Sequence, residues 1–161
     1  MEELKGGNKM EELKNENIVE EENSVEEMTL EDFLLGTDIE NITKKIKISD
    51  RFPDEEKFYF EIKAMTFPEK EDLRRSCTKT NNQGRKVFND KKFSKMIIIQ
   101  QTLHPKFNSV ELMKKAKCFT PEECVDKLLL SGEQETLIQQ ISELSGFDNP
   151  LKQLVEEAKN L

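Results

Sequence analysis

Residues 58–76, "FYFEIKAMTFPEKEDLRRS", decide the fold because the spacing of their apolar residues changes halfway along. The first half alternates apolar and polar side chains, which is typical of a strand with one buried face. The apolar members of this strand are Phe58, Phe60, Ile62 and Ala64. From Thr66 onward, acidic residues come early and arginines late, which favours a helix capped by Thr66. A strand that leads directly into a helix predicts mixed α and β structure.

The chain before this stretch contains a second strand pattern and a short helix pattern. In "KKIKI", residues 44–48, two isoleucines fall on one face: Ile46 and Ile48. The nine residues that follow suit the loop between two antiparallel strands and are too many for a tight turn. Further upstream, "TLEDFLLG" at 29–36 predicts a short helix with a capping pair at its start, Thr29 and Asp32.

The chain after residue 76 is harder to interpret. The polar run "TKTNNQGRKV", residues 78–87, predicts an exposed loop that leads into extended chain. In "NDKKFSKMIIIQQTLHP", residues 89–105, the run "MIII" also suits a buried strand. We predict a helix there because Pro105 enforces a stop and because five residues fall at helical spacing: Phe93, Met96, Ile97, Gln100 and Leu103.

The C-terminal third has the clearest helix signals. Ser109 caps "VELMKKAK", and Thr120, Pro121 and Glu123 begin another helix as a capping box. A helix from Ser131 is expected to bury Leu137, Ile138, Ile141 and Leu144. The run "ISELSGFDNP", residues 141–150, predicts a helix–helix corner, with Gly146 in a left-handed conformation and Asn149 as the next cap.

The last predicted helix carries apolar residues at helical spacing: Leu151, Leu154, Val155 and Ala158. This stripe either completes the core, which is the default, or is exposed to the helix of another protein. Leu151, Leu154 and Val155 are therefore the candidate partner-binding residues. Taken together, these patterns predict an α+β fold of short antiparallel strands packed with a mainly helical C-terminal part.

Charge is distributed unevenly along the 161 residues, whose net charge is −8. Residues 1–40 hold 14 acidic and 3 basic residues, 41–117 hold 10 and 19, and 118–161 hold 9 and 3. Residues 1–27 contain no aromatic residue and too few apolar ones to offset the entropy of ordering, which predicts a disordered acidic tail. We expect residues 28–161 to form a single domain.

The basic middle segment raises the alternative of a nucleic-acid-binding protein, because lysines and arginines contact phosphates. Its candidate contacts are Lys44, Lys45, Lys47, Arg74, Arg75, Arg85, Lys86, Lys91, Lys92 and Lys95. The segment has no nucleic-acid recognition motif, and its aromatic residues are spaced like core residues. A solvated face that offsets the acidic ends is therefore the favoured interpretation.

The sequence contains few residues that could form a catalytic site. His104, the single histidine, precedes Pro105 at a predicted helix end, where a surface role is favoured over that of a general base. Three cysteines, Cys77, Cys118 and Cys124, form no CxxC pair, so we expect free thiols in a reducing cytosol. No apolar run approaches the roughly 18 residues that cross a bilayer. The sequence predicts neither an enzyme nor a metal or cofactor site, and no membrane partner.

The order of segments resembles the XkdN-like tail assembly chaperones of phages and of the defective prophage element PBSX. The matching runs are "LEDFLLGTDIENI", "FYFEIKAM", "DLRRSCTK", "FSKMIIIQQTLHPKFNS", "TPEECVDKLLLSGE" and "ISELSGFDNPLKQLVEEAKN". They span roughly residues 29 to 160. The acidic N-terminus departs from the family pattern, which leaves the role of the tail open.

The resemblance implies a non-catalytic assembly factor of the host cytoplasm that is absent from the finished virion. Such chaperones bind the tape measure protein, a long and mostly helical chain, and keep it soluble while the tail tube polymerises around it. The resemblance also implies self-association into a homo-oligomer and the tail tube protein as a further partner. It supplies no catalytic residue to transfer to this sequence.

The start of the chain gives a first testable prediction. "GGNKM", residues 6–10, can be encoded by a purine-rich ribosome-binding site followed by a start codon, which predicts Met10 as the natural first residue. Intact-mass measurement of the protein from its native source is expected to give a chain that lacks residues 1–9. Retention of Met1 would contradict this prediction.

Overall fold

The computed structural model describes residues 26–147 and 156–160. The chain divides into two units, Met1–Leu35 and Gly36–Leu161. The described part of the first unit contains helix α1, Leu30–Leu35. Its predicted cap is confirmed, because the backbone N–H of Asp32 donates to the Thr29 hydroxyl and that of Thr29 donates to the Asp32 carboxylate, both at 3.1 Å. The predicted disordered tail lies almost wholly outside the described residues.

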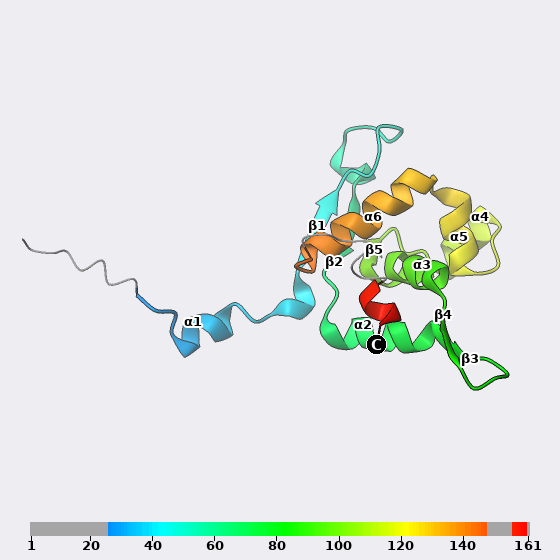
Figure 1. The fold of residues 1–161 in the computed structure, drawn as a ribbon. Helices are drawn as coiled ribbons and strands as arrows, with labels where there is room; N and C mark the ends of the chain where they lie inside the picture. The colour runs from blue at the N-terminus through cyan, green and yellow to red at the C-terminus, as the bar shows by residue number, and fades with distance from the viewer. Residues whose placement is uncertain (1–25, 148–155, 161) are drawn as a thin grey trace, which may run out of the picture. The chain divides into compact units, whose positions relative to one another are not determined.

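The second unit has the predicted α+β fold (Figure 1). Its helices are α2 Phe67–Ser76, α3 Asp90–Gln101, α4 Val110–Ala116, α5 Pro121–Leu128 and α6 Ser131–Leu144. Two short 3₁₀ helices are η1 Ile39–Asn41 and η2 Glu56–Phe58. The strands are β1 Thr43–Ile46, β2 Phe60–Lys63, β3 Thr78–Thr80, β4 Lys86–Phe88 and β5 Thr102–His104. Residues 156–159 are also helical.

The main sheet has the order β1–β2–β5, with β2 antiparallel to both neighbours. The β1–β2 pair was predicted, and its register places Ile46 opposite Phe60. The predicted faces are confirmed, since five of the named residues are buried: Ile46, Ile48, Phe60, Ile62 and Ala64. Phe58 is half-buried and lies in η2 instead of the strand.

The predicted helix after β2 is confirmed as α2. The Thr66 hydroxyl accepts from the backbone N–H of Glu69, and the Glu69 carboxylate accepts from the backbone N–H of Thr66, which forms a complete capping box. Pro68 lies in the first turn, where a missing N–H costs nothing. The Lys63 ammonium lies 2.5 Å from the Glu69 carboxylate and so links β2 to this cap.

Two sequence expectations between residues 78 and 105 were only partly right. The predicted loop at 78–87 belongs to a hairpin, in which β3 and β4 pair in antiparallel fashion around a turn held by the Asn81 side chain. The predicted helix at 89–105 exists as α3, but the chain leaves it after Gln101 and forms β5. Gln100 was predicted on the buried stripe; it is exposed, whereas Gln101 is buried.

The C-terminal predictions hold as far as the described residues reach. In α6, Leu137, Ile138 and Ile141 are buried and Leu144 is half-buried. Gly146 has φ +91°, the left-handed conformation predicted for the end of this helix. Asn149 and Pro150 lie outside the described residues. Ala158 is buried and belongs to the core, as the predicted stripe requires.

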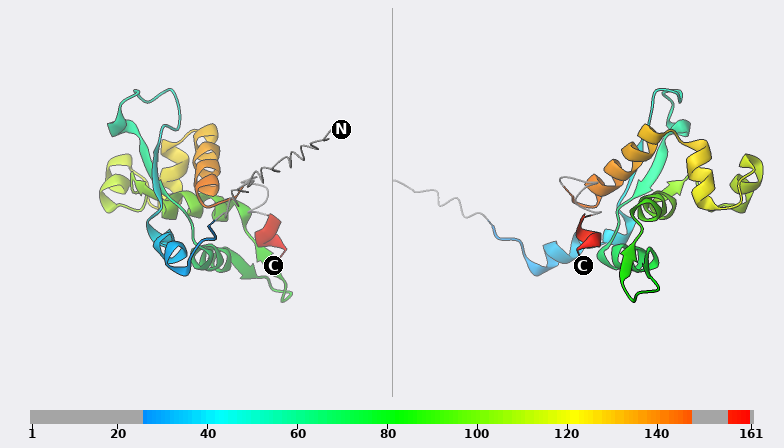
Figure 2. Two further views of the ribbon diagram at one scale, coloured as in Figure 1. Left: turned by 90° about the vertical axis from the view of Figure 1, so that its left-hand side faces the viewer. Right: turned by 45° about the vertical axis from the view of Figure 1, so that its right-hand side comes forward.

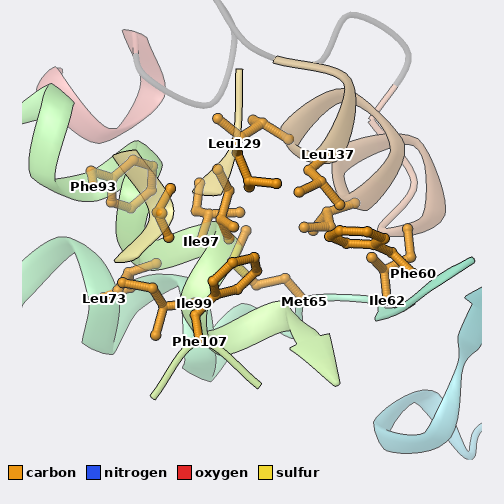
Figure 3. Close-up of a cluster of buried hydrophobic side chains, with 14 of the residues drawn as sticks. Phe60, Ile62, Met65, Leu73, Phe93, Ile97, Ile99, Phe107, Leu129 and Leu137 are labelled. Carbon is orange, nitrogen blue, oxygen red and sulfur yellow. The ribbon is translucent and has the colours of Figure 1, made fainter. Parts of the chain in front are cut away.

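The core is centred on α3 (Figures 2 and 3). Phe93, Ile97, Ile98 and Ile99 are all buried, so most of the circumference of this helix is covered. Its main contacts are with α2, α5, α6 and β5. In Figure 3 the labelled side chains of the sheet and helices point toward one another, with Phe60 and Ile62 meeting Leu137 and Leu129 around the space next to Ile97.

An ion pair between the exposed Arg51 and the buried Glu133 joins the β1–β2 connection to the start of α6. The Glu133 carboxylate is 3% exposed and accepts from the Arg51 guanidinium at 2.5 and 2.8 Å and from the Ser49 hydroxyl at 2.7 Å. It also accepts from the backbone N–H of Leu130. The hydrogen bonds from Arg51 are the main cause that lowers the pKa of Glu133 from 4.5 to about 2, and burial opposes them.

This pair predicts an acid-dependent loss of stability. Because the pKa of Glu133 is lowered by folding, its stabilisation is complete above pH 4.5 and is lost as the pH falls toward 2. Between pH 6 and pH 3 we expect the free energy of unfolding to fall by about 2 kcal/mol more in the wild type than in Glu133→Gln. Urea denaturation at a series of pH values measures the difference. Parallel pH profiles for the two proteins would show that the pair contributes no such stability.

Candidate functional site

The described residues contain no group of three or more His, Cys, Asp or Glu residues that could hold a metal ion. His104 is exposed at the end of β5, beside an open hollow of about 300 Å³ whose other lining residues include Lys106 and Glu111. Among the described residues, no helix has the length and apolar character for a membrane span.

The prediction of three free thiols was wrong for two of them. Cys77 is free and buried, but Cys118 and Cys124 form a disulfide, with their Cα atoms 5.5 Å apart. The cause is the turn between α4 and α5. Lys117 takes a left-handed conformation at the end of α4, and the chain then turns so that Cys118 meets Cys124 on α5. A spacing of six residues carries no sequence signature for this pairing.

The basic middle segment is partly neutralised by carboxylates of the same chain. Of the ten candidate phosphate contacts, half form ion pairs, and the members of this set are Lys45, Lys47, Arg74, Arg75 and Lys95. Lys44 donates to Gln140. These pairs agree with a solvated face that offsets acidic residues.

The most distinctive surface surrounds α4. One side of this helix borders an open hollow of about 440 Å³, which we call the α4 hollow; it is lined by Val110, Met113, Lys114, Lys117, Cys118 and Phe119. Phe119 is 92% exposed and Val110 is 62% exposed. Helix α4 lies at the periphery of its unit in each view of Figures 1 and 2. Exposed apolar side chains that gather around a hollow mark an interaction site.

Local caps explain why Phe119 is presented to solvent. The Ser109 hydroxyl accepts from the backbone N–H of Leu112 to begin α4, and the Thr120 hydroxyl accepts from that of Glu123 to begin α5. Phe119 lies between the two helices, and its backbone N–H donates to the Glu123 carboxylate at 2.7 Å. The backbone N–H of Phe119 is therefore satisfied, while its aromatic ring is exposed.

The rim of the α4 hollow is basic. Within the described residues, neither Lys114 nor Lys117 has an ion pair to a carboxylate, whereas the neighbouring Lys115 pairs with Glu111 at 2.8 Å. An apolar hollow with two such lysines suits a partner that combines apolar and acidic side chains. The other side of α4 borders a second, smaller hollow of about 220 Å³, whose lining includes Phe52, Pro105 and Leu112.

The sequence did not identify Phe119. Its neighbours carry cap signals, and a cap pattern gives no information on whether the preceding side chain is covered. The predicted partner-binding residues Leu151, Leu154 and Val155 lie outside the described residues. The segment that follows them is anchored, because Glu157 pairs with Lys70 of α2 and Lys159 pairs with Asp90 of α3.

Comparison with known proteins gives concordant matches. The family described as phage XkdN-like tail assembly chaperone protein matches residues 30–159. The Bacillus subtilis (strain 168) phage-like element PBSX protein XkdN is 31% identical over 154 residues, which cover 91% of this chain and 98% of that protein. The protein YqbN of the same strain is 32% identical over 135 residues, or 80% of this chain and 91% of YqbN. The crystal structure of YqbN aligns with a TM-score of 0.53 at 27% identity, covering 65% of this chain and 85% of that one.

A pair of phenylalanine variants tests whether the α4 hollow is separate from the core. Phe119→Ala is expected to change the free energy of unfolding by no more than about 0.5 kcal/mol, because the ring is exposed. Phe107→Ala is the matched control, since Phe107 is buried, and should cost about 3–5 kcal/mol. Chemical denaturation of both variants measures these values. Equal losses would place Phe119 in the core and remove the case for a binding surface.

Proposed function

This chain belongs to the XkdN-like family of phage tail assembly chaperones, and on that basis we propose that it binds the tape measure protein and keeps it soluble during assembly of the tail tube. Family membership rests on the match to residues 30–159 and on the relative at 31% identity. Binding of the tape measure protein, and its maintenance in soluble form, is our inference. It follows from what the family resemblance implies and from the surface around α4.

The properties of the tape measure protein, the proposed client, determine what such a chaperone must do. A long helical chain that is later enclosed in a tube exposes apolar stripes beforehand, and such stripes aggregate in water. A chaperone must cover them and must also release them when the tube subunits arrive. A small, open and partly charged contact surface fits this need better than a deep pocket, because its affinity is limited.

The observation that carries the proposal is the α4 hollow. Phe119, Val110 and Met113 offer apolar surface to a helical stripe, and the two rim lysines would attract acidic residues beside it. Exposed aromatic side chains are frequent anchors of protein–protein contacts. We propose that one helix of the client lies along α4.

We also retain the sequence-based contact region as a proposal. Leu151, Leu154 and Val155 would form a second apolar stripe for the client, next to a segment whose Ala158 is in the core. The proposed role is non-catalytic, is carried out in the host cytoplasm, and ends before the virion is complete. The tail tube protein is a further proposed partner. The nucleic-acid alternative is less favoured, because half of its candidate contacts are ion-paired.

Co-expression tests this function. The tape measure protein encoded in the same genome should be mainly insoluble alone and several-fold more soluble with this chain, because its apolar stripes are then covered. The variant Phe119→Ala/Lys114→Glu/Lys117→Glu should lose most of this effect. The matched charge-reversal variant Lys86→Glu/Lys91→Glu, at exposed positions outside the hollow, should keep it. The soluble fraction is measured by centrifugation and quantitative gel analysis.

Two outcomes would contradict different parts of the proposal. If the wild-type chain leaves the tape measure protein as insoluble as before, the chaperone role toward this client is wrong. If the wild type works and the hollow variant works equally well, the function stands and the α4 hollow is not the contact surface.

A further inference from the structure

The bond between Cys118 and Cys124 joins the turn after α4 to the buried side of α5. Cys118 follows directly after Lys117, the left-handed residue that ends α4, and it is one of the residues that line the α4 hollow. Cys124 lies on α5, next to α4, and is completely buried. The disulfide therefore connects a surface element to the core. A change in this bond acts on the border of the α4 hollow.

Hydrogen bonds would still guide the turn if the disulfide were reduced. The backbone N–H of Cys118 donates to the Met113 carbonyl oxygen at 3.0 Å. The Lys127 ammonium donates to the Lys117 carbonyl oxygen at 3.1 Å, at an exposed position. Exposed hydrogen bonds open more readily than buried packing. The turn can thus keep its path without the covalent bond, but it is held less firmly.

The structure also suits the reduced form of Cys118. Its sulfur atom lies 3.8 Å from the Met113 carbonyl oxygen, which can accept from a thiol S–H. A disulfide sulfur carries no hydrogen and cannot use that acceptor. Each oxidation state therefore has a partner for Cys118 in place, the sulfur atom of Cys124 in one state and the Met113 carbonyl in the other.

Cys118 is the easier of the two sulfur atoms to reach from solvent. It borders the hollow and is 7% exposed, whereas Cys124 is 0% exposed. Lys114 and Lys117 line the same hollow, and nearby cations favour the thiolate, which is the form that attacks a disulfide. Cys118 is therefore placed to react first with an oxidant, and Cys124 is placed to complete the bond.

We propose that Cys118 and Cys124 form a reversible thiol–disulfide switch that sets how firmly the turn between α4 and α5 is held. The oxidant is a disulfide of low molecular mass. The Cys118 thiolate attacks one of its sulfur atoms, and the other half leaves as a thiolate that takes up the proton lost by Cys118. The Cys124 thiolate then attacks the Cys118 sulfur, and the second half leaves in the same way. Two protein thiols are oxidised while the small disulfide is reduced to two thiols, and reduction reverses these steps.

The proposed location in the host cytoplasm favours a reversible bond, because disulfides of cytosolic proteins are usually transient or redox-sensing. Oxidation restrains the turn and keeps Phe119 at the border of the hollow, whereas reduction lets the turn move. A surface that is ordered beforehand binds more tightly. The oxidised chain should therefore hold the client more firmly, and the reduced chain should release it more readily. This last step rests on the proposed function, but the switch itself does not.

Thiol exchange on the native full chain tests the chemistry. The chain is reduced with dithiothreitol, the reagent is removed, and glutathione disulfide is added without denaturant. Mass spectrometry should show that the bond between Cys118 and Cys124 forms and that dithiothreitol breaks it again. In Cys124→Ala, a glutathione adduct should remain on Cys118. Failure of the bond to form, a bond that forms only in denaturant, or an adduct confined to Cys77 would overturn the proposal.

Hydrogen–deuterium exchange tests the effect on the turn in the wild-type chain, without any client. Amides of residues 110–124 should exchange at least about threefold faster in the reduced state, while those of α3 stay protected. Cys118→Ala/Cys124→Ala should exchange like the reduced chain whatever the oxidant, and the matched control Cys77→Ala should respond like the wild type. Equal exchange in the two states, or faster exchange throughout the chain, would refute a local switch.

The tape measure protein separates this inference from the proposed function. Its soluble fraction should be about twofold higher with the oxidised chain than with the reduced chain. Cys118→Ala/Cys124→Ala in the same redox buffers controls for effects on the client itself. If both states of the wild type keep the client equally soluble, the chaperone role stands and its control by the switch is wrong. If neither state does so, the proposed function is wrong, and the exchange results alone decide the switch.

Discussion

The burial of α3 is the constraint on which the rest of the second unit depends. Three consecutive residues, Ile97, Ile98 and Ile99, are buried, and consecutive residues of a helix point in directions about 100° apart. A helix buried in this way must be covered on several sides at once. Its contacts with α2, α5, α6 and β5 provide that cover, and the three-stranded sheet is placed where β5 continues directly from the end of α3.

Helix α4 lies at the edge of this arrangement. Its main contact is with α5, and its residues Leu112, Met113 and Ala116 pack against the core. Phe107, just before α4, is buried and ties the region to the core, whereas Phe119, just after α4, is exposed. Of these two phenylalanines, twelve positions apart, one therefore stabilises the core and the other is presented to solvent. A change of the exposed Phe119 side chain can therefore leave the packing around α3 unaltered.

The sequence predicted those features that depend on neighbouring residues. The period of two in β2, the cap at Thr66 and the left-handed Gly146 are local, and each was found as predicted. Strand β5 was missed because three residues carry no detectable period and are ordered by pairing with distant β2. The Cys118–Cys124 pair and the exposure of Phe119 likewise depend on how α4 and α5 meet, which no local pattern encodes.

The distribution of ion pairs explains how a chain with so much charge can make selective contacts. Part of the positive charge of the middle segment is paired with carboxylates of the same chain, as Lys45 is with Glu56. The ion pair of Arg51 with Glu133 holds the start of α6. Cations at the α4 hollow lack such partners among the described residues, so an approaching acidic segment finds its attraction concentrated there. Exposed pairs of this kind contribute little energy and are screened by salt. A contact built from them and from a few apolar side chains binds and releases readily, which is the behaviour that temporary assembly contacts require.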